Sequence, residues 1–196
     1  MAPAIFMLHG YGSDENDLFS FAGEIPDYYT IISAQAPYAL PDMGNAWYSI
    51  NFDAPQGKFN NITEAIQSRD LVLKFIDECV NTYSLDKDKL SLLGFSQGGI
   101  ISYALAMSYP EKFKQIIALS AYIDESMFKE DFQNKDHQHL RFFSTHGTYD
   151  PIIPVDWAKQ NKPFLSQYTD KVFYKEYPIG HSINPEILQK LLSWLA

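Results

Sequence analysis

The chain has 196 residues, of which 46% are hydrophobic and 20% charged, so it is long enough for one globular domain, residues 1–196, with a substantial core. Its formal net charge of −9 disfavours a nucleic-acid partner, because phosphate binding needs clustered basic residues, and only Arg69 and Arg141 are arginines that could clamp a phosphate. The single cysteine, Cys79, excludes an internal disulfide and a cysteine-based metal cluster.

The predicted elements begin with the apolar run 4–8, which follows Pro3 directly. This run is typical of a core strand and not of a signal peptide, because no basic stretch or small-residue cleavage site accompanies it. No apolar run elsewhere has the length of a membrane span. We therefore expect a cytoplasmic protein without stable membrane insertion, either a monomer or a homodimer.

Strand-like and helix-like segments then alternate to the end of the chain. Further strands are predicted at 30–33, 89–95, 115–120, 140–145 and 172–177, and helices at 98–108, 155–168 and 185–195. One more helix opens with the capping-box sequence Asn61-Ile62-Thr63-Glu64 and carries apolar side chains at helical spacing as far as Tyr83. This alternation predicts an α/β fold with a single, doubly wound, mostly parallel sheet and helices on both faces.

Two segments depart from this alternation. Residues 37–60 are rich in Pro, Gly and Asn but hold several aromatic side chains, so they form either a packed surface loop or a substrate-binding flap. Residues 122–138 mix apolar and charged side chains, and we expect an amphipathic surface helix there.

The pentapeptide Gly94-Phe95-Ser96-Gln97-Gly98 stands between the predicted strand 89–95 and the predicted helix 98–108. A G-x-S-x-G sequence between a strand and a helix is typical of the nucleophile elbow of α/β-hydrolases. The turn is so sharp that side chains two positions before and after the serine would collide with the flanking elements, which explains the two glycines. The sequence therefore predicts Ser96 as a catalytic nucleophile.

A serine nucleophile needs a general base, and the base needs an orienting acid. In this fold the three occur in the chain order Ser, Asp or Glu, His, each just after a strand. Asp150 follows the strand 140–145 through a short turn, and His181 follows the strand 172–177. Asp124 also follows a strand and is the rival acid, whereas His146 is expected to order the turn before Asp150 by hydrogen bonds.

The sequence resembles that of a known enzyme family over nearly its whole length. The segments that carry the resemblance are, in chain order, LHGYGSD at 8–14, APY at 36–38, AWY at 46–48, GFSQGG at 94–99, HG at 146–147, DP at 150–151 with Pro154, and GH at 180–181. The chain is similar to the phospholipase/carboxylesterase family of α/β-hydrolases, which includes acyl-protein thioesterases and lysophospholipases.

The resemblance implies an α/β-hydrolase fold and the catalytic residues Ser96, Asp150 and His181. It also implies an oxyanion hole built by the backbone N–H groups of Tyr11 and Gln97, in agreement with the glycine-rich turn after the first strand. No cofactor or metal is expected. Because the chain starts almost at the strand before that turn, we expect the early strands of the fold to be trimmed, which leaves about six or seven strands.

The expected function is that of a serine hydrolase that cleaves carboxylic esters through an acyl-enzyme intermediate, with a small-molecule ester or thioester as substrate. After Ser120 the chain reads Ala121-Tyr122-Ile123, where thioesterase relatives usually have a glycine and then a short apolar segment, so Tyr122 is expected to shorten the acyl pocket. The alternatives are a long-chain lysophospholipase or acyl-protein thioesterase, and a non-catalytic binding protein on the same scaffold. The predicted substrate-binding residues are Trp47, Tyr48, Phe52, Tyr122 and Ile152.

Overall fold

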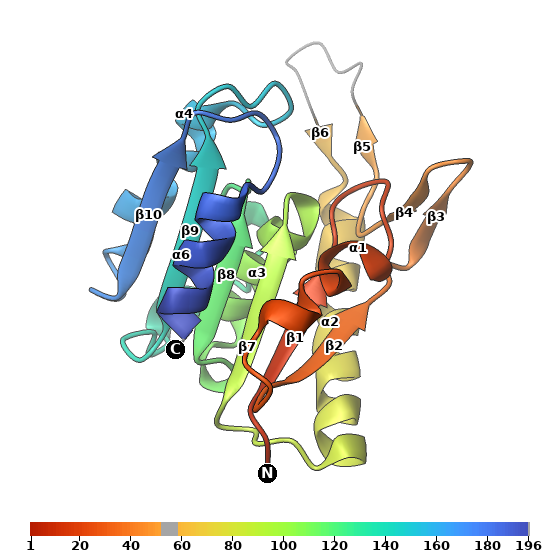
Figure 1. The fold of residues 1–196 in the computed structure, drawn as a ribbon, viewed down its shortest axis with the longest axis vertical. Coiled ribbons are helices and arrows are strands. Elements are labelled where there is room, and N and C mark those ends of the chain that lie inside the picture. Colours follow the sequence, from red (N-terminus) through yellow and green to blue (C-terminus); the bar gives the residue numbers. More distant parts are fainter. Residues whose placement is uncertain (52–58, 196) are drawn as a thin grey trace.

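A computed structural model describes residues 1–51 and 59–195 of the chain. Six parallel strands form the main sheet in the order β10-β9-β8-β7-β1-β2 (Figure 1). They are β1 (Ala4–Leu8), β2 (Thr30–Ala34), β7 (Leu90–Phe95), β8 (Gln115–Leu119), β9 (Arg141–Gly147) and β10 (Val172–Tyr177). All five pairings between these strands are parallel, which confirms the predicted fold class and strand count.

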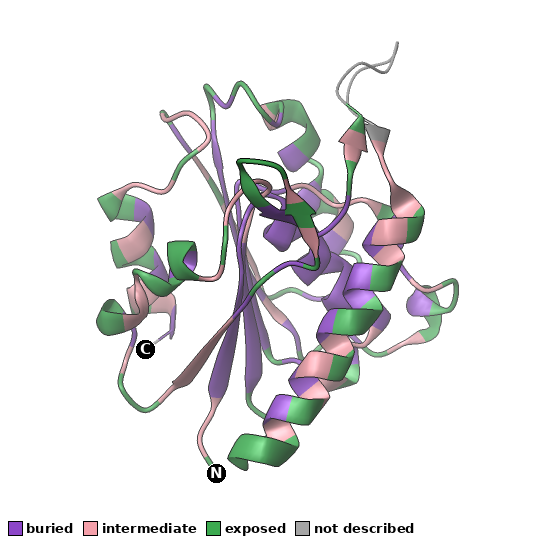
Figure 2. Ribbon diagram, turned by 90° about the vertical axis from the view of Figure 1, so that its right-hand side faces the viewer, coloured by how far each residue is buried: buried purple, intermediate pink, exposed green. Residues whose placement is uncertain are grey.

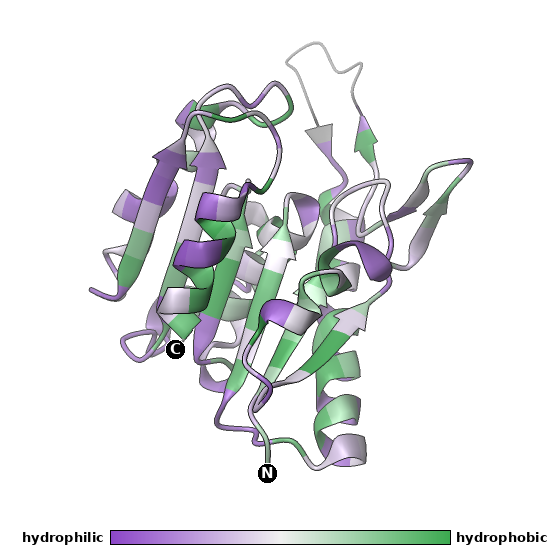
Figure 3. Cartoon of the chain, in the orientation of Figure 1, coloured by the Kyte–Doolittle hydropathy of each residue, from purple (hydrophilic) through white to green (hydrophobic). Residues whose placement is uncertain are grey.

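Helices cover both faces of the sheet. One face carries α2 (Ile62–Tyr83) and α3 (Gln97–Ser108), and the other carries α1 (Asn16–Phe19) and α6 (Pro185–Leu195), which lies in front of the sheet in Figure 1. Helix α2 turns its buried residues toward the sheet, as the stripe along it shows in Figure 2, whereas α3 is buried on all sides. Hydrophobic residues accordingly concentrate in the inner strands (Figure 3).

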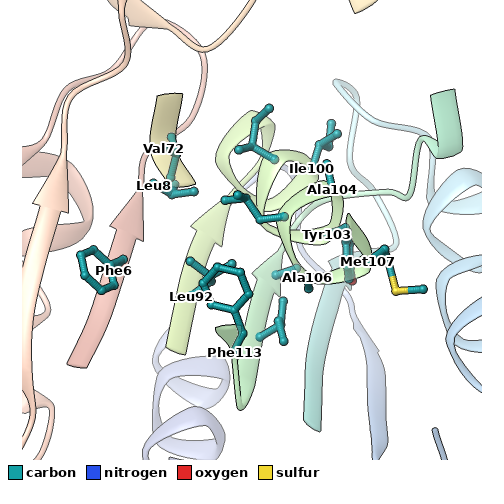
Figure 4. Packing of buried hydrophobic residues seen from close by; sticks show 14 of the residues in the cluster. Phe6, Leu8, Val72, Leu92, Ile100, Tyr103, Ala104, Ala106, Met107 and Phe113 are labelled. Carbon is teal, nitrogen blue, oxygen red and sulfur yellow. The ribbon is translucent and has the colours of Figure 1, made fainter. Parts of the chain in front are cut away.

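The strands divide their side chains between two cores, because successive residues of a strand point to opposite faces. Phe6 and Leu8 of β1 join the core under α2 and α3, which also contains Val72 and Ile100 (Figure 4). Ile5 and Met7 of the same strand join the core under α6. All five residues of β1 are buried, as expected for a parallel strand covered on both faces.

The predicted helix 155–168 is wrong as a single element. The structure has two short helices, α4 (Val155–Ala158) and α5 (Asn161–Leu165). Pro163 explains the break, because its ring clashes with the carbonyl group four residues earlier and it has no N–H to donate.

The predicted amphipathic helix in 122–138 is also wrong. The segment contains two 3-10 turns, η3 (Glu125–Met127) and η4 (Phe132–Asn134), and two more such turns lie at η1 (Ala22–Glu24) and η2 (Pro110–Lys112). The Asp124 side chain accepts a hydrogen bond from the Ser126 backbone N–H, so the chain turns locally instead of entering an α-helix.

Residues 37–60 contain two small antiparallel pairs. They are β3 (Tyr38–Leu40) with β4 (Gly44–Ala46), and β5 (Ile50–Asn51) with β6 (Phe59–Asn60). Both pairs stand near the carboxyl ends of the main strands (Figure 1). None of the helices in the described part of the chain is long and apolar enough to cross a membrane.

Candidate active site

Ser96 occupies the sharp turn between β7 and α3, with φ +52° and ψ −118°. This backbone conformation is rare for a residue with a side chain and is a form of local strain. A Cβ atom on Gly94 would lie 2.3 Å from the Gly98 carbonyl oxygen, and one on Gly98 would lie 1.9 Å from the Leu8 carbonyl oxygen. The two glycines of the pentapeptide are therefore required by the close approach of α3 to β7 and β1.

The structure brings Ser96, His181 and Asp150 together from the ends of three strands. The Ser96 Oγ atom lies 2.9 Å from His181 Nε2, and His181 Nδ1 lies 2.6 Å from Asp150 Oδ2. With Nδ1–H donating to the carboxylate, Nε2 accepts the hydrogen bond from the serine hydroxyl group. Ser96 is 7% exposed, so the hydroxyl group lies just below the molecular surface.

The Asp150 carboxylate is buried but well supplied with donors. Its Oδ1 atom accepts hydrogen bonds from the Ile152 and Ile153 amides at 2.8 and 2.9 Å. Burial acts to raise the pKa of Asp150, but these amides and His181 outweigh it and hold the pKa below its ordinary value. Asp150 is thus an anion at neutral pH, as an orienting acid must be.

The turn after β1 approaches the serine closely. A Cβ atom on Gly10 would lie 3.4 Å from the Ser96 Cβ atom. Tyr11 follows in this turn, and Gln97 is the first residue of α3, where backbone N–H groups lack an acceptor within the helix. The structure therefore places Gln97 next to Ser96 and brings the turn that leads into Tyr11 close to it, and the role of both residues as donors stays a prediction.

The Gln97 side chain has a structural task that the sequence did not indicate. Its Oε1 atom accepts from the Trp47 backbone N–H, and its Nε2 atom donates to the Tyr48 carbonyl oxygen, both at 2.7 Å. The Trp47 indole N–H in turn donates to the His9 carbonyl oxygen at 2.8 Å. These bonds join the residue after the nucleophile to the segment between β4 and β5.

The predicted substrate-binding residues separate into three groups. Trp47 and Tyr48 are 1% and 0% exposed, so they belong to the core beneath the site, which favours the packed loop over the flap at these positions and corrects their assignment to substrate binding. Phe52 lies outside the described residues. Tyr122 is half-buried, with its ring centroid 5.1 Å from that of Trp157, and Ile152 is 46% exposed just after Asp150.

Two competing residues have other tasks. The Asp124 carboxylate accepts from the Ser126 backbone N–H and from the Asn60 amide group, and it is not the acid that meets His181. His146 donates through Nε2 to the Ile153 carbonyl oxygen at 2.9 Å and lies 3.4 Å from Asp150 Oδ2, so it orders the turn as predicted. Among the described residues no three His, Cys, Asp or Glu side chains are arranged to hold a metal ion.

A parallel six-stranded sheet with a strained serine between strand and helix defines the chain as an α/β-hydrolase. The phospholipase/carboxylesterase family matches residues 1–196, so the chain belongs to that family and is a carboxylic ester hydrolase.

Curated relatives and solved structures are similar over most of the chain. Acyl-protein thioesterase 1 of Candida albicans is 26% identical over 98% of this chain and 90% of the relative. Acyl-protein thioesterase 1 of Kluyveromyces lactis is 30% identical over 84% of this chain and 72% of the relative. The Bacillus cereus carboxylesterase structure has a TM-score of 0.84 at 20% identity, covering 99% of this chain and 87% of that one, and shows the same fold.

Proposed function

We propose that residues 1–196 act as one domain that hydrolyses carboxylic esters through an acyl-enzyme intermediate. Ser96 is the nucleophile, His181 the general base and Asp150 the orienting acid. The observation that carries this proposal is the hydrogen-bonded chain Ser96–His181–Asp150, at 2.9 and 2.6 Å, on a strained strand-to-helix turn. We further propose that the enzyme works in the cytoplasm on a small ester or thioester.

The geometry supports the following course of reaction. His181 Nε2 takes the Ser96 proton as the serine oxygen attacks the acyl carbon, and the Asp150 anion stabilises the imidazolium ion that forms. The amides of Tyr11 and Gln97 stabilise the oxyanion. His181 then protonates the leaving group, and in the second half it removes a proton from the water that attacks the acyl-enzyme.

The two enzymatic alternatives differ in the length of the acyl chain that the enzyme accepts. Tyr122 supports a short acyl pocket, because its hydroxyl oxygen is fixed 2.6 Å from the Asn60 amide nitrogen and its ring packs against Trp157. The names of the thioesterase relatives support the long-chain alternative. So do the exposed side chains of Tyr149 and Ile152 beside Asp150, which offer apolar area to a chain.

The test is hydrolysis of p-nitrophenyl esters of rising acyl length by the wild type, Ser96→Ala and Ser193→Ala. Ser193 is an exposed serine of α6 and serves as the control. Loss of Ser96 should lower kcat at least about 10⁴-fold, while Ser193→Ala stays within twofold. A peak at short chains supports a small-acyl esterase, a peak at long chains supports the alternative, and full activity of Ser96→Ala would refute the mechanism.

A further inference from the structure

A cavity of about 480 Å³ lies between the segment after β8 and helix α4. Its walls combine the rings of Tyr122 and Trp157 with the polar side chains of Asn60 and Asp124. Asp124 is the single charged side chain among the described residues that line it. The cavity therefore presents aromatic surface together with one negative charge.

Asp124 keeps its charge uncompensated in the described part of the chain. Its Oδ1 atom accepts from the Ser126 backbone N–H at 3.2 Å and from the Ser126 hydroxyl group at 2.5 Å, and its Oδ2 atom accepts from the Asn60 amide group at 3.2 Å. All three donors are neutral. None of the ion pairs between described residues includes Asp124. A carboxylate has room for about four hydrogen bonds, so capacity and charge remain for a ligand.

A buried hydroxyl group stands behind this wall. Tyr48 is 0% exposed, and its Oη atom has no hydrogen-bond partner among the described residues. Burial raises the pKa of Tyr48 well above its ordinary value, nearby Tyr122 and Asp124 raise it further, and the Gln97 side chain lowers it.

The cavity is connected to the nucleophile along two routes. The Ser96 backbone N–H donates to the Leu119 carbonyl oxygen at 2.9 Å, and the chain reaches Tyr122 three residues later. From the other side, the Tyr48 carbonyl oxygen accepts from the side chain of Gln97, the residue after the nucleophile. The segments beside the cavity are thus bonded to the elbow that carries Ser96.

We propose that this cavity binds an alkylammonium or quaternary ammonium group carried by the ester substrate, an inference that rests on the proposed esterase function. An organic cation is attracted both by the carboxylate and by the faces of aromatic rings, and a quaternary ammonium group needs no hydrogen-bond acceptors. Trp157 is 40% exposed and so offers ring surface to such a group.

The first experiment measures tetramethylammonium as a probe. Its binding is followed by calorimetry, and its inhibition of neutral p-nitrophenyl acetate hydrolysis is measured for the wild type, Asp124→Asn and Asp136→Asn. Asp136 is an exposed acid outside the cavity lining, so its variant has the same change in net charge. We expect Asp124→Asn to weaken the binding of tetramethylammonium and its inhibition at least tenfold. In Asp136→Asn, binding and inhibition should stay within twofold of wild type, and the kcat for the neutral ester should stay within twofold of wild type.

Trp157→Leu removes the aromatic surface without changing the charge, and it should also weaken the binding of tetramethylammonium severalfold. It keeps the test decisive if Asp124→Asn is unstable in thermal unfolding. Equal affinity in the wild type and both cavity variants, or no binding to the wild type, would overturn the proposal. If neutral-ester hydrolysis persists in Ser96→Ala, the esterase mechanism itself fails, and the two failures are thereby distinguished.

The second experiment compares cationic esters with neutral esters of the same shape. On the alcohol side the pair is butyrylcholine and 3,3-dimethylbutyl butyrate, and on the acyl side it is the p-nitrophenyl esters of 4-(trimethylammonio)butyrate and 5,5-dimethylhexanoate. We expect kcat/KM to favour the cationic member of one pair at least tenfold, and Asp124→Asn to abolish that preference. A lack of preference in both pairs would refute the assignment to the substrate.

Discussion

Ser96 shows how much backbone constraint a single catalytic residue requires. Its positive φ costs roughly 1–3 kcal/mol, which the surrounding structure must offset. The turn is held on one side by the Ser96 backbone N–H bond to Leu119 and on the other by the bond from the Ile100 N–H to the Ser96 carbonyl oxygen. Strain at this residue is thus maintained by β8 and α3 together, and it keeps the hydroxyl group turned toward His181.

Gly98 is the residue where this constraint can be tested. In Gly98→Ala the new methyl group would lie 1.9 Å from the Leu8 carbonyl oxygen, a backbone atom that cannot move without displacing β1. We expect a loss of more than about 3 kcal/mol in the free energy of unfolding, measured by urea denaturation. Gly23→Ala is the matched control, since its methyl group would have no atom within 4 Å and should change stability by less than about 1 kcal/mol. Similar stability of the two variants would contradict this account of the elbow.

The residues just described also show what sequence alone can predict. Ser96, Asp150 and His181 were found because each follows a strand, in an order that the fold imposes, and the structure brings the three side chains together. The burial of Trp47 could not be predicted, because aromatic residues in a loop rich in Pro and Gly pack equally well on a flap or in a core. The side-chain bonds of Gln97 depend on that same packing.

At the scale of elements, strands and long helices were predictable and short helices were not. Buried parallel strands are continuous apolar runs, and α2 repeats its apolar residues over many turns, so both leave a clear pattern. The turns η3 and η4 span three residues each, too few to establish a period. The prediction of an amphipathic helix there failed because the burial of Met127 and Phe132 gives an apolar spacing without a helix.

The start of α2 fits half of the predicted capping box. The Asn61 side chain accepts from the Glu64 backbone N–H at 3.2 Å, as predicted, but the Glu64 side chain reaches the Ser49 N–H at 2.7 Å and so joins α2 to the segment before β5. We expect Asn61→Ala to lower the free energy of unfolding by about 1 kcal/mol, because the N-cap bond is lost. Asn61→Asp keeps an acceptor and should stay near wild type in the same urea titration. Equal loss in both variants would show that the cap bond is not the cause.

At the scale of the whole molecule, the carboxyl ends of the strands position the site, and packing on both faces of the sheet stabilises the fold. The carboxyl ends of β7, β9 and β10 each lead into a residue of the proposed triad, so residues up to 85 positions apart in the chain meet in one place. The two cores on either face hold these strands in register. A substitution that weakens core packing is therefore expected to shift the strands and, with them, the positions of the three catalytic side chains.

Two buried histidines make the stability of the whole molecule depend on pH. Burial lowers the pKa of His9 and of His146 below the ordinary value, so each is more easily protonated in the unfolded chain. Both are neutral in either state at high pH; as the pH falls below about 6.5, the unfolded chain takes up protons first and the free energy of unfolding decreases until the folded pKa is passed. The pKa of Asp150 is also held below its ordinary value, so its proton uptake lowers the free energy of unfolding too, but only as the pH falls below about 3.9, which separates the two effects. Urea titrations from pH 7.5 to 5.0 should show this decrease, whereas stability that is flat across the window would rule out buried neutral histidines as its determinants.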